Sequence, residues 1–221
     1  MVNGSRAVDR VRLVAARLLA RWQRDRRHIE ELVERQDERG ERDEGGPWSY
    51  AERRRLRELV YSCVRLHGRY DHVIAVRSRK SKRPSPELNS VLWVALHELT
   101  ELGHPPHAVV DEAVRASVEL GQGHARGFVN GLLRGVAREG IEDDFPDPSD
   151  ARSFAETWHS HPRWLVDRWA DRLGEAEMLG LCAANNERPR LYLRSMPRRR
   201  KMLAAALDAL EWQTEAVDDL P

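Results

Sequence analysis

Lysine, cysteine and long apolar runs are scarce in this sequence of 221 residues. Lys80, Lys82 and Lys201 are its lysines, so nearly all of its positive charge is carried by arginine. Two lone cysteines, Cys63 and Cys182, provide no metal framework and, without a secretory context, no disulfide. No apolar run reaches the roughly 18 residues of a membrane span, and the charged N-terminal segment has no apolar signal core. We therefore expect a cytoplasmic protein that does not contact a membrane.

Strand-like alternation of apolar and polar residues is also rare, and glycine and proline are not enriched. The hydrophobic fraction of 41% is sufficient to build a core. The charged fraction of 33% exceeds the usual quarter or so, which is typical of long solvated helix faces. An α-dominated fold follows, and the length allows one domain and part of a second.

The charges are distributed unevenly along the chain. Residues 1–100 carry 22 basic and 15 acidic side chains, a net charge of +7, and the remainder carries 15 and 21, a net of −6, which together give +1. A basic half indicates an anionic partner. Arginine presents a planar fork that suits phosphate and base stacking, although a bias toward arginine can equally reflect genome composition.

Apolar residues at three- and four-residue spacing predict a helical bundle in the first part of the chain. Helices are expected at 5–22, 50–74, 87–102, 107–120 and 124–139, joined by short connections. The acidic, proline-containing segment 140–150 predicts a boundary between domains at 1–142 and 150–221.

Further helices are expected around 151–158, from Ser160, from Glu175 to the Asn185–Asn186 pair, and at 199–211, with a short strand at 191–196.

Several motifs resemble a known family. Residues 87–139 contain ELNSVLWVALHEL, AVVDEAV (108–114) and FVNGLLR (128–134), and they resemble the last three helices of NusB-type domains. More narrowly, they resemble the version that opens the RsmB (Sun/Fmu) family of 16S rRNA cytosine-C5 methyltransferases. HSHPRWLVDRW (159–169) and AANNERPRLYLR (183–194) resemble segments that follow the NusB-like domain in that family and are absent from stand-alone NusB.

The resemblance implies an all-α NusB-like bundle, followed by a helical segment and the first strand of a truncated α+β domain. It implies an RNA-binding, substrate-positioning region of an enzyme that uses S-adenosylmethionine. In that enzyme a thiolate adds to C6 of cytosine, C5 takes the methyl group, and a second cysteine assists release. We expect this chain to lack the catalytic domain, to bind no cofactor and to be inactive alone. Cys182 lacks the following glycines of a cofactor loop, so it is interpreted as a buried helix residue.

Arginines are the predicted contacts to rRNA, because each neutralised phosphate releases counterions. In NusB-like domains an arginine-rich N-terminal helix contacts RNA, and the resemblance carries this role to Arg6, Arg10 and Arg12. The full set of candidates is Arg6, Arg10, Arg12, Arg17, Arg21, Arg77, Arg79, Lys80, Lys82, Arg83, Asn130, Arg134, Arg188, Arg190 and Arg194. Any one of these arginines can equally be a solvated surface charge. For Asn130 a structural role is favoured, because an amide beside a buried face must find hydrogen-bond partners.

No catalytic or metal-binding residue is expected. The pairs His104–His107 and His159–His161 lack further ligands at metal-binding spacing, and both lie at proline-marked helix starts. Ser160 is the predicted N-cap of the following helix, with Pro162 in its first turn. Two alternatives remain open: a stand-alone antitermination factor that binds RNA with a ribosomal protein, and a helical scaffold with no RNA role. DNA is not an expected partner.

Overall fold

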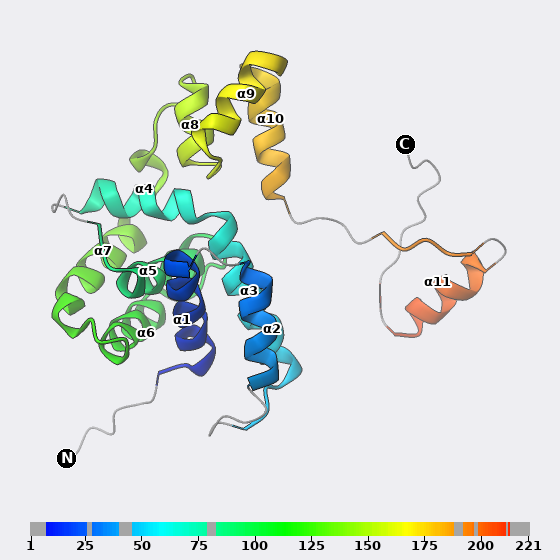
Figure 1. Cartoon of the computed structure of the whole chain (residues 1–221), viewed down its shortest axis with the longest axis horizontal. Helices are drawn as coiled ribbons and strands as arrows, with labels where there is room; N and C mark the ends of the chain where they lie inside the picture. The colour runs from blue at the N-terminus through cyan, green and yellow to red at the C-terminus, as the bar shows by residue number, and fades with distance from the viewer. Residues whose placement is uncertain are drawn as a thin grey trace. The chain divides into compact units, whose positions relative to one another are not determined.

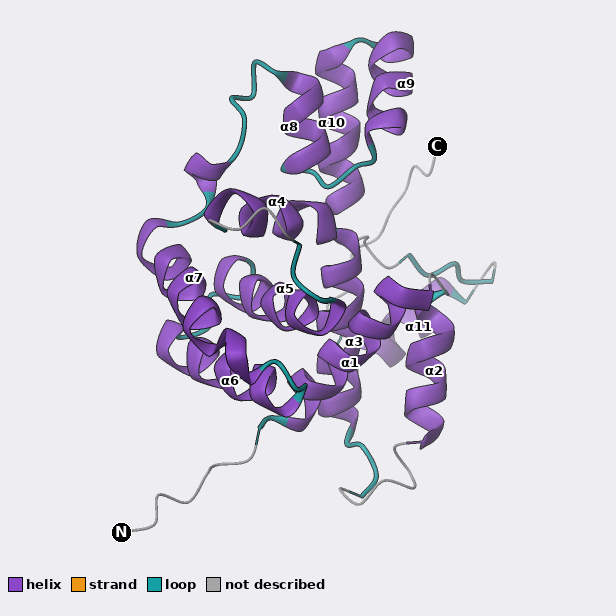
Figure 2. Ribbon diagram, turned by 60° about the vertical axis from the view of Figure 1, so that its left-hand side comes forward, coloured by secondary structure: helices purple, strands orange, loops and turns teal. Residues whose placement is uncertain are grey.

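The computed structural model describes residues 8–25, 28–39, 46–78, 83–187, 192–196, 199–210 and 212. In this described part every regular element is helical and no strand is formed, which confirms the predicted helical bundle. By its contacts the chain divides into two units, residues 1–186 and 187–221. Figures 1 and 2 show the helices of the first unit gathered around α5 and, beyond α4, a second group of three.

The described part of residues 8–139 forms a helical bundle. Its helices are α1 (Arg10–Asp25), α2 (Ile29–Arg39), α3 (Tyr50–Arg65), α4 (His67–Arg77), α5 (Pro86–Thr100), α6 (Pro106–Glu119) and α7 (Arg126–Glu139). Helix α5 packs against α1, α3, α4, α6 and α7, and its residues from Leu88 to Glu98 are all buried. A helix surrounded on every side needs apolar residues all round, which explains the segment ELNSVLWVALHEL.

Local sequence sets the helix ends. Ser49 and Glu52 form a reciprocal capping box at the start of α3. At the start of α5, the Ser85 hydroxyl accepts a hydrogen bond from the Leu88 N–H at 3.3 Å, and Pro86 occupies the first turn. Helix α7 ends at Glu139, and the C-cap Gly140 that follows has a φ of 75°, which is disfavoured for other residues.

A second group of helices has its own small core. Helices α8 (Ala151–Thr157), α9 (Arg163–Leu173) and α10 (Glu175–Asn186) pack around Ala155, Val166, Met178 and Cys182, which are completely buried. Burial raises the pKa of the Cys182 thiol, which disfavours the thiolate. The interpretation of Cys182 as a buried helix residue is therefore confirmed.

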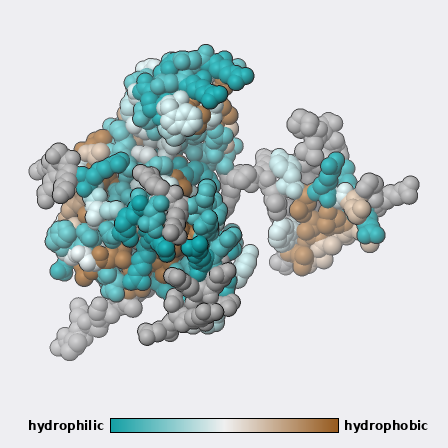
Figure 3. Space-filling model, in the orientation of Figure 1, coloured by the Kyte–Doolittle hydropathy of each residue, from teal (hydrophilic) through white to brown (hydrophobic). Residues whose placement is uncertain are grey.

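The second unit contains α11 (Arg200–Asp208), which buries none of its residues. Met202, Leu210 and Trp212 are exposed, and apolar surface gathers at this helix in Figure 3. The strand predicted at 191–196 is not formed in the described residues 192–196. An extended segment becomes a strand only when a neighbour satisfies its backbone, and the described residues provide none.

Three expectations about the bundle need correction. Helix α1 extends three residues beyond the predicted end at Trp22. The helix predicted at 50–74 is two helices, broken at Leu66, where the His67 ring hydrogen-bonds the Val64 carbonyl at 2.8 Å. The apolar spacing within 124–139 predicts Phe128 in the core, but its side chain is only partly buried, at the edge of the core. The charged sequence ERGERDEGG after α2 predicts a polar loop, and its residues 40–45 lie outside the described residues.

None of the helices in the described part is long and apolar enough to cross a membrane.

Candidate RNA-binding surface

Helix α1 presents a row of arginines on the side opposite its buried face. Val11, Ala15 and Leu19 are buried, and the helix packs against α3 and α5. Arg17, Arg21 and Arg24 are spaced four and three residues apart, which places them on one face of the helix. This row is called the α1 arginine face.

The three side chains of the α1 arginine face are held loosely. Arg17 is exposed and forms no ion pair with any residue in the described ranges. Arg21 is paired with Asp25 at 3.2 Å, and its side chain remains 40% exposed. Arg24 is paired with Glu87 and remains 49% exposed. Exposed pairs of this kind contribute little stability, so a phosphate can displace their carboxylates at low cost.

Arg24 was missed by the sequence prediction, because the helix was expected to end at Trp22. The spacing contained the signal: Arg17 and Arg24 are seven residues apart, which is two turns of one helix face.

Arg12, in contrast, forms an ion pair with a buried carboxylate. Its Nε lies 2.7 Å from a carboxylate oxygen of Glu98, whose side chain is only 1% exposed. Arg55 and His104 also contact that carboxylate, at 3.3 and 3.2 Å. A buried carboxylate needs such partners, because its desolvation is costly. The pairs tie α1 to α5 and α3.

Asp9 extends this buried network at the start of α1. Burial alone would raise the pKa of Asp9, but hydrogen bonds from the Arg12 backbone N–H and the Arg55 side chain outweigh it. The pKa of Asp9 therefore lies below its usual value. Its backbone N–H donates to Glu112 at 3.0 Å, which joins α1 to α6.

Arg10 also has internal partners. Its guanidinium donates to the Gly46 carbonyl at 2.9 Å and lies 4.3 Å from the centre of the Trp48 ring.

Arg77 and Arg83 border the predicted basic loop and differ in exposure. The Arg77 side chain is 15% exposed and bonds Asp144 at 2.6 Å and the Gly140 carbonyl at 2.6 Å. Arg83 is 82% exposed and is paired with Asp71 at 2.9 Å.

Asn130 accepts a hydrogen bond from the exposed Arg134 at 3.0 Å, one turn along α7. Arg194 is exposed in the second unit. The remaining predicted contacts lie outside the described residues: Arg6, Arg79, Lys80, Lys82, Arg188 and Arg190.

Residues 158–161 form a turn, called the 158–161 turn, that is bound to α4 by hydrogen bonds. Arg69 donates to the Trp158 carbonyl at 2.6 Å and lies over the Trp158 ring at 4.4 Å. The Gly68 N–H donates to the Ser160 hydroxyl at 2.9 Å. Ser160 is therefore not the predicted N-cap of α9. Its φ of 60° turns the chain, and Pro162 occupies the cap position.

Within the described residues no group of three His, Cys, Asp or Glu side chains can hold a metal ion.

An exposed row of arginines on a helical bundle is the kind of surface with which proteins contact nucleic-acid phosphates. The bundle itself matches the NusB family model over residues 9–138, and the chain belongs to the NusB family. Residues 161–221 match the ferredoxin-like domain of RsmF/B-like methyltransferases.

Relatives of known name share the first part of the chain. A protein of Mycobacterium tuberculosis provisionally named a methyltransferase is 34% identical over 149 residues, which cover 63% of this chain and 32% of that protein. Ribosomal RNA small subunit methyltransferase B of Pasteurella multocida is 33% identical over 143 residues, 63% of this chain and 30% of that protein. The enzyme of the same name from Escherichia coli is 30% identical over 142 residues, which cover 63% of this chain and 31% of that enzyme. The aligned part spans about a third of these relatives.

Proposed function

We propose that this chain is the RNA-binding, substrate-positioning N-terminal region of an S-adenosylmethionine-dependent 16S rRNA (cytosine-C5) methyltransferase. The observation that carries the proposal is the α1 arginine face, which is exposed on a bundle of the NusB family. The relatives' names support rRNA as the partner. The match of residues 161–221 to the ferredoxin-like domain of RsmF/B-like methyltransferases favours this function over a stand-alone antitermination factor.

The proposed division into domains at 1–142 and 150–221 is supported by the bounds of the family models and by the grouping of buried residues. The two family models end and begin at residues 138 and 161, on either side of segment 140–150. The buried apolar residues also form two clusters, one drawn from residues 11–141 and one from residues 151–182. The contacts, in contrast, keep α8 to α10 in one unit with the bundle.

The described residues do not fit S-adenosylmethionine. A cofactor of this kind needs a glycine-rich loop that lets the backbone approach it, usually after a strand. Cys182, the residue that most resembles such a motif, is buried inside α10, and no strand is formed in the described part. No step of methyl transfer is assigned to this chain, and its role is to bind and orient RNA.

Fluorescence anisotropy with labelled fragments of 16S rRNA, measured from low to physiological salt, tests the proposal. If about four phosphates are neutralised, the logarithm of the association constant should fall with the logarithm of salt concentration with a slope of about −3 to −4. Absence of saturable binding at low salt would contradict the proposal, and binding that is insensitive to salt would contradict the phosphate contacts.

A further inference from the structure

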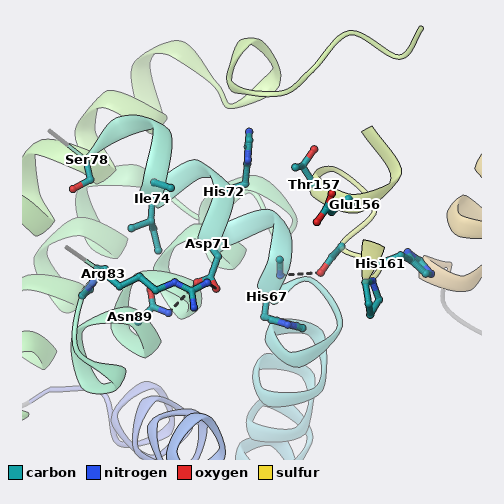
Figure 4. A pocket seen from close by; sticks show the side chains of 15 residues that line it. His67, Asp71, His72, Ile74, Ser78, Arg83, Asn89, Glu156, Thr157 and His161 are labelled. Carbon is teal, nitrogen blue, oxygen red and sulfur yellow. Dashed lines mark hydrogen bonds and ion pairs between the residues drawn. The ribbon is translucent and has the colours of Figure 1, made fainter. Parts of the chain in front are cut away.

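A cleft of about 770 Å³ lies between α4 and the 158–161 turn. Its walls include His67, Asp71 and Ala75 of α4 on one side and Thr157 and His161 on the other, and Figure 4 shows these walls facing each other. Arg83 reaches across to Asp71 from a third side. This volume is typical of pockets that bind small molecules.

Gly68 and Ser160 both line the cleft, and a contact between them joins its two walls. Ser160 is held in the left-handed region and accepts from the Gly68 N–H at 2.9 Å. A Cβ on Gly68 would lie only 2.9 Å from the Ser160 hydroxyl oxygen, so this approach requires glycine. Strained backbone of this kind persists where surrounding structure holds it, and it is concentrated at functional sites.

The lining offers hydrogen-bonding groups that the protein leaves available. The rings of His67, His72 and His161 each use one nitrogen on a backbone carbonyl, at 2.8 to 2.9 Å. A carbonyl only accepts, so that nitrogen carries the proton. The second ring nitrogen of each has no partner in the described part of the chain. The Ser160 hydroxyl oxygen accepts a hydrogen bond from the Gly68 N–H. The hydroxyl proton itself is not donated to any of the described residues.

Each carboxylate of the lining is paired with an arginine, and the lining carries no excess of positive charge. Asp71 is paired with Arg83 at 2.9 Å, and Glu156 is paired with Arg163 at 3.5 Å. A phosphate needs excess positive charge, whereas a neutral heterocycle needs donors and acceptors around its edge. The lining therefore suits a nucleic-acid base better than a phosphate.

The cleft adjoins the end of α1. The Trp22 ring lies 5.4 Å from the ring of His67, and Gln23 accepts from the amide of Asn89, which also lines the cleft. Arg24 of the α1 arginine face is the next residue along the helix. The α1 arginine face and the cleft therefore meet at the same end of α1.

From this geometry we propose that the cleft receives one unpaired base of the bound RNA, which the histidine ring nitrogens and the Ser160 hydroxyl contact at its edge. The inference rests on the proposed RNA-binding function and adds a sequence-selective contact to it. Phosphate contacts position an RNA without reading its sequence, and a base pocket supplies that selectivity.

A pair of neighbouring substitutions on α4 tests the pocket. Ala75 lines the cleft and is exposed, so Ala75→Trp fills part of the cleft without disturbing the core. Val76 is 53% exposed and does not line the cleft, so Val76→Trp is the matched control. Thr157→Trp fills the cleft from the opposite wall and serves if Ala75→Trp is unstable in thermal melting. The probes are fluorescein-labelled 12-nucleotide homopolymers of A, C and U.

The wild type should discriminate among the three homopolymers. Ala75→Trp should weaken binding of the preferred one by about tenfold, as expected for loss of one base contact, and should reduce the discrimination. The salt slope should not change, since no phosphate contact is removed. Val76→Trp should stay within about twofold of the wild type, because it removes no base contact.

Equal affinities and equal base preference for Ala75→Trp and Val76→Trp would overturn the base pocket and leave the proposed function standing. A smaller salt slope in Ala75→Trp would also overturn it, by indicating a phosphate site. Failure of the wild type to bind any RNA would instead overturn the proposed function itself.

Discussion

At the scale of single residues, arginines of one helix perform different tasks. Arg12 neutralises the buried carboxylate of Glu98, whereas Arg17, less than two turns further along α1, is exposed to solvent. The difference follows from the helix face each occupies. Removing a partner from a buried charge is costly, while removing an exposed arginine changes mainly what the surface can bind.

Substitution of Arg12 should therefore destabilise the protein far more than substitution of Arg17. Arg12→Ala should lower the free energy of unfolding by about 3 kcal/mol, because Glu98 remains buried with fewer partners. Arg17→Ala should change it by less than about 0.5 kcal/mol. Urea denaturation followed by circular dichroism measures both quantities. Similar losses in the two variants would show that the Arg12–Glu98 pair is not the structural contact described.

At the scale of elements, the 158–161 turn joins the two groups of helices in the first unit. Asn186 of α10 donates to the His159 carbonyl at 2.9 Å, and Arg69 of α4 holds Trp158. The turn is thus fastened from both sides. The His159 ring is half-buried there, close to the positive charge of Arg69.

The fastening of this turn should weaken in acid. Burial, helped by the charges of Arg69 and His161, lowers the pKa of His159 to about 4, below the value of about 6.5 expected for unfolded chains. The unfolded state therefore binds the proton more tightly, so stability is complete above pH ~6.5 and is lost as pH falls toward ~4.

His159→Asn removes this titration. The melting temperature of the wild type should fall more than that of His159→Asn between pH 7 and pH 5, whatever their difference at pH 7. Other histidines whose pKa is lowered, such as His97 and His161, are present in both proteins and cancel in the comparison. An equal fall in the two proteins would exclude His159 as the source of acid sensitivity.

Most of the helices were predictable because their signals are local, although the break between α3 and α4 was not expected. The apolar stripe of α1, the Ser85–Pro86 start of α5 and Gly140 after α7 are all readable from neighbouring residues. The role of Ser160 was not predictable, because its hydroxyl is bound by Gly68, 92 positions away. The cleft was missed for the same reason, since its walls come from segments far apart in the sequence.

At the scale of the whole molecule, the resemblance to a family could be recognised from motifs in the correct order along the chain. The RNA-binding surface could not, because it depends on which arginine side chains are exposed in the folded protein. Periodicity identifies which arginines lie off the apolar stripe. It does not identify which of these arginines form ion pairs with carboxylates inside the protein, as Arg12 does with Glu98 and Arg77 does with Asp144. That distinction depends on tertiary contacts between α1, α4, α5 and the segment after α7.

The chain should not bind S-adenosylmethionine by itself. The described residues offer no loop that approaches a cofactor, and Cys182 is buried. Isothermal titration with S-adenosylmethionine should therefore show no saturable heat, with the complete methyltransferase of a relative as the positive control. Saturable micromolar binding to this chain would contradict the conclusion that its residues do not fit the cofactor.

Whether the α1 arginine face is the RNA contact is decided by comparing two triple variants of equal charge. R17Q/R21Q/R24Q removes that face, and R126Q/R168Q/R172Q removes three exposed arginines from α7 and α9. Anisotropy titrations of 16S rRNA fragments across salt give the affinity and the slope. The α1 variant should bind more weakly and lose about 2 to 3 units of slope, while the control keeps the wild-type slope. Equal weakening in both variants, or none in the α1 variant while it remains folded, would contradict the account.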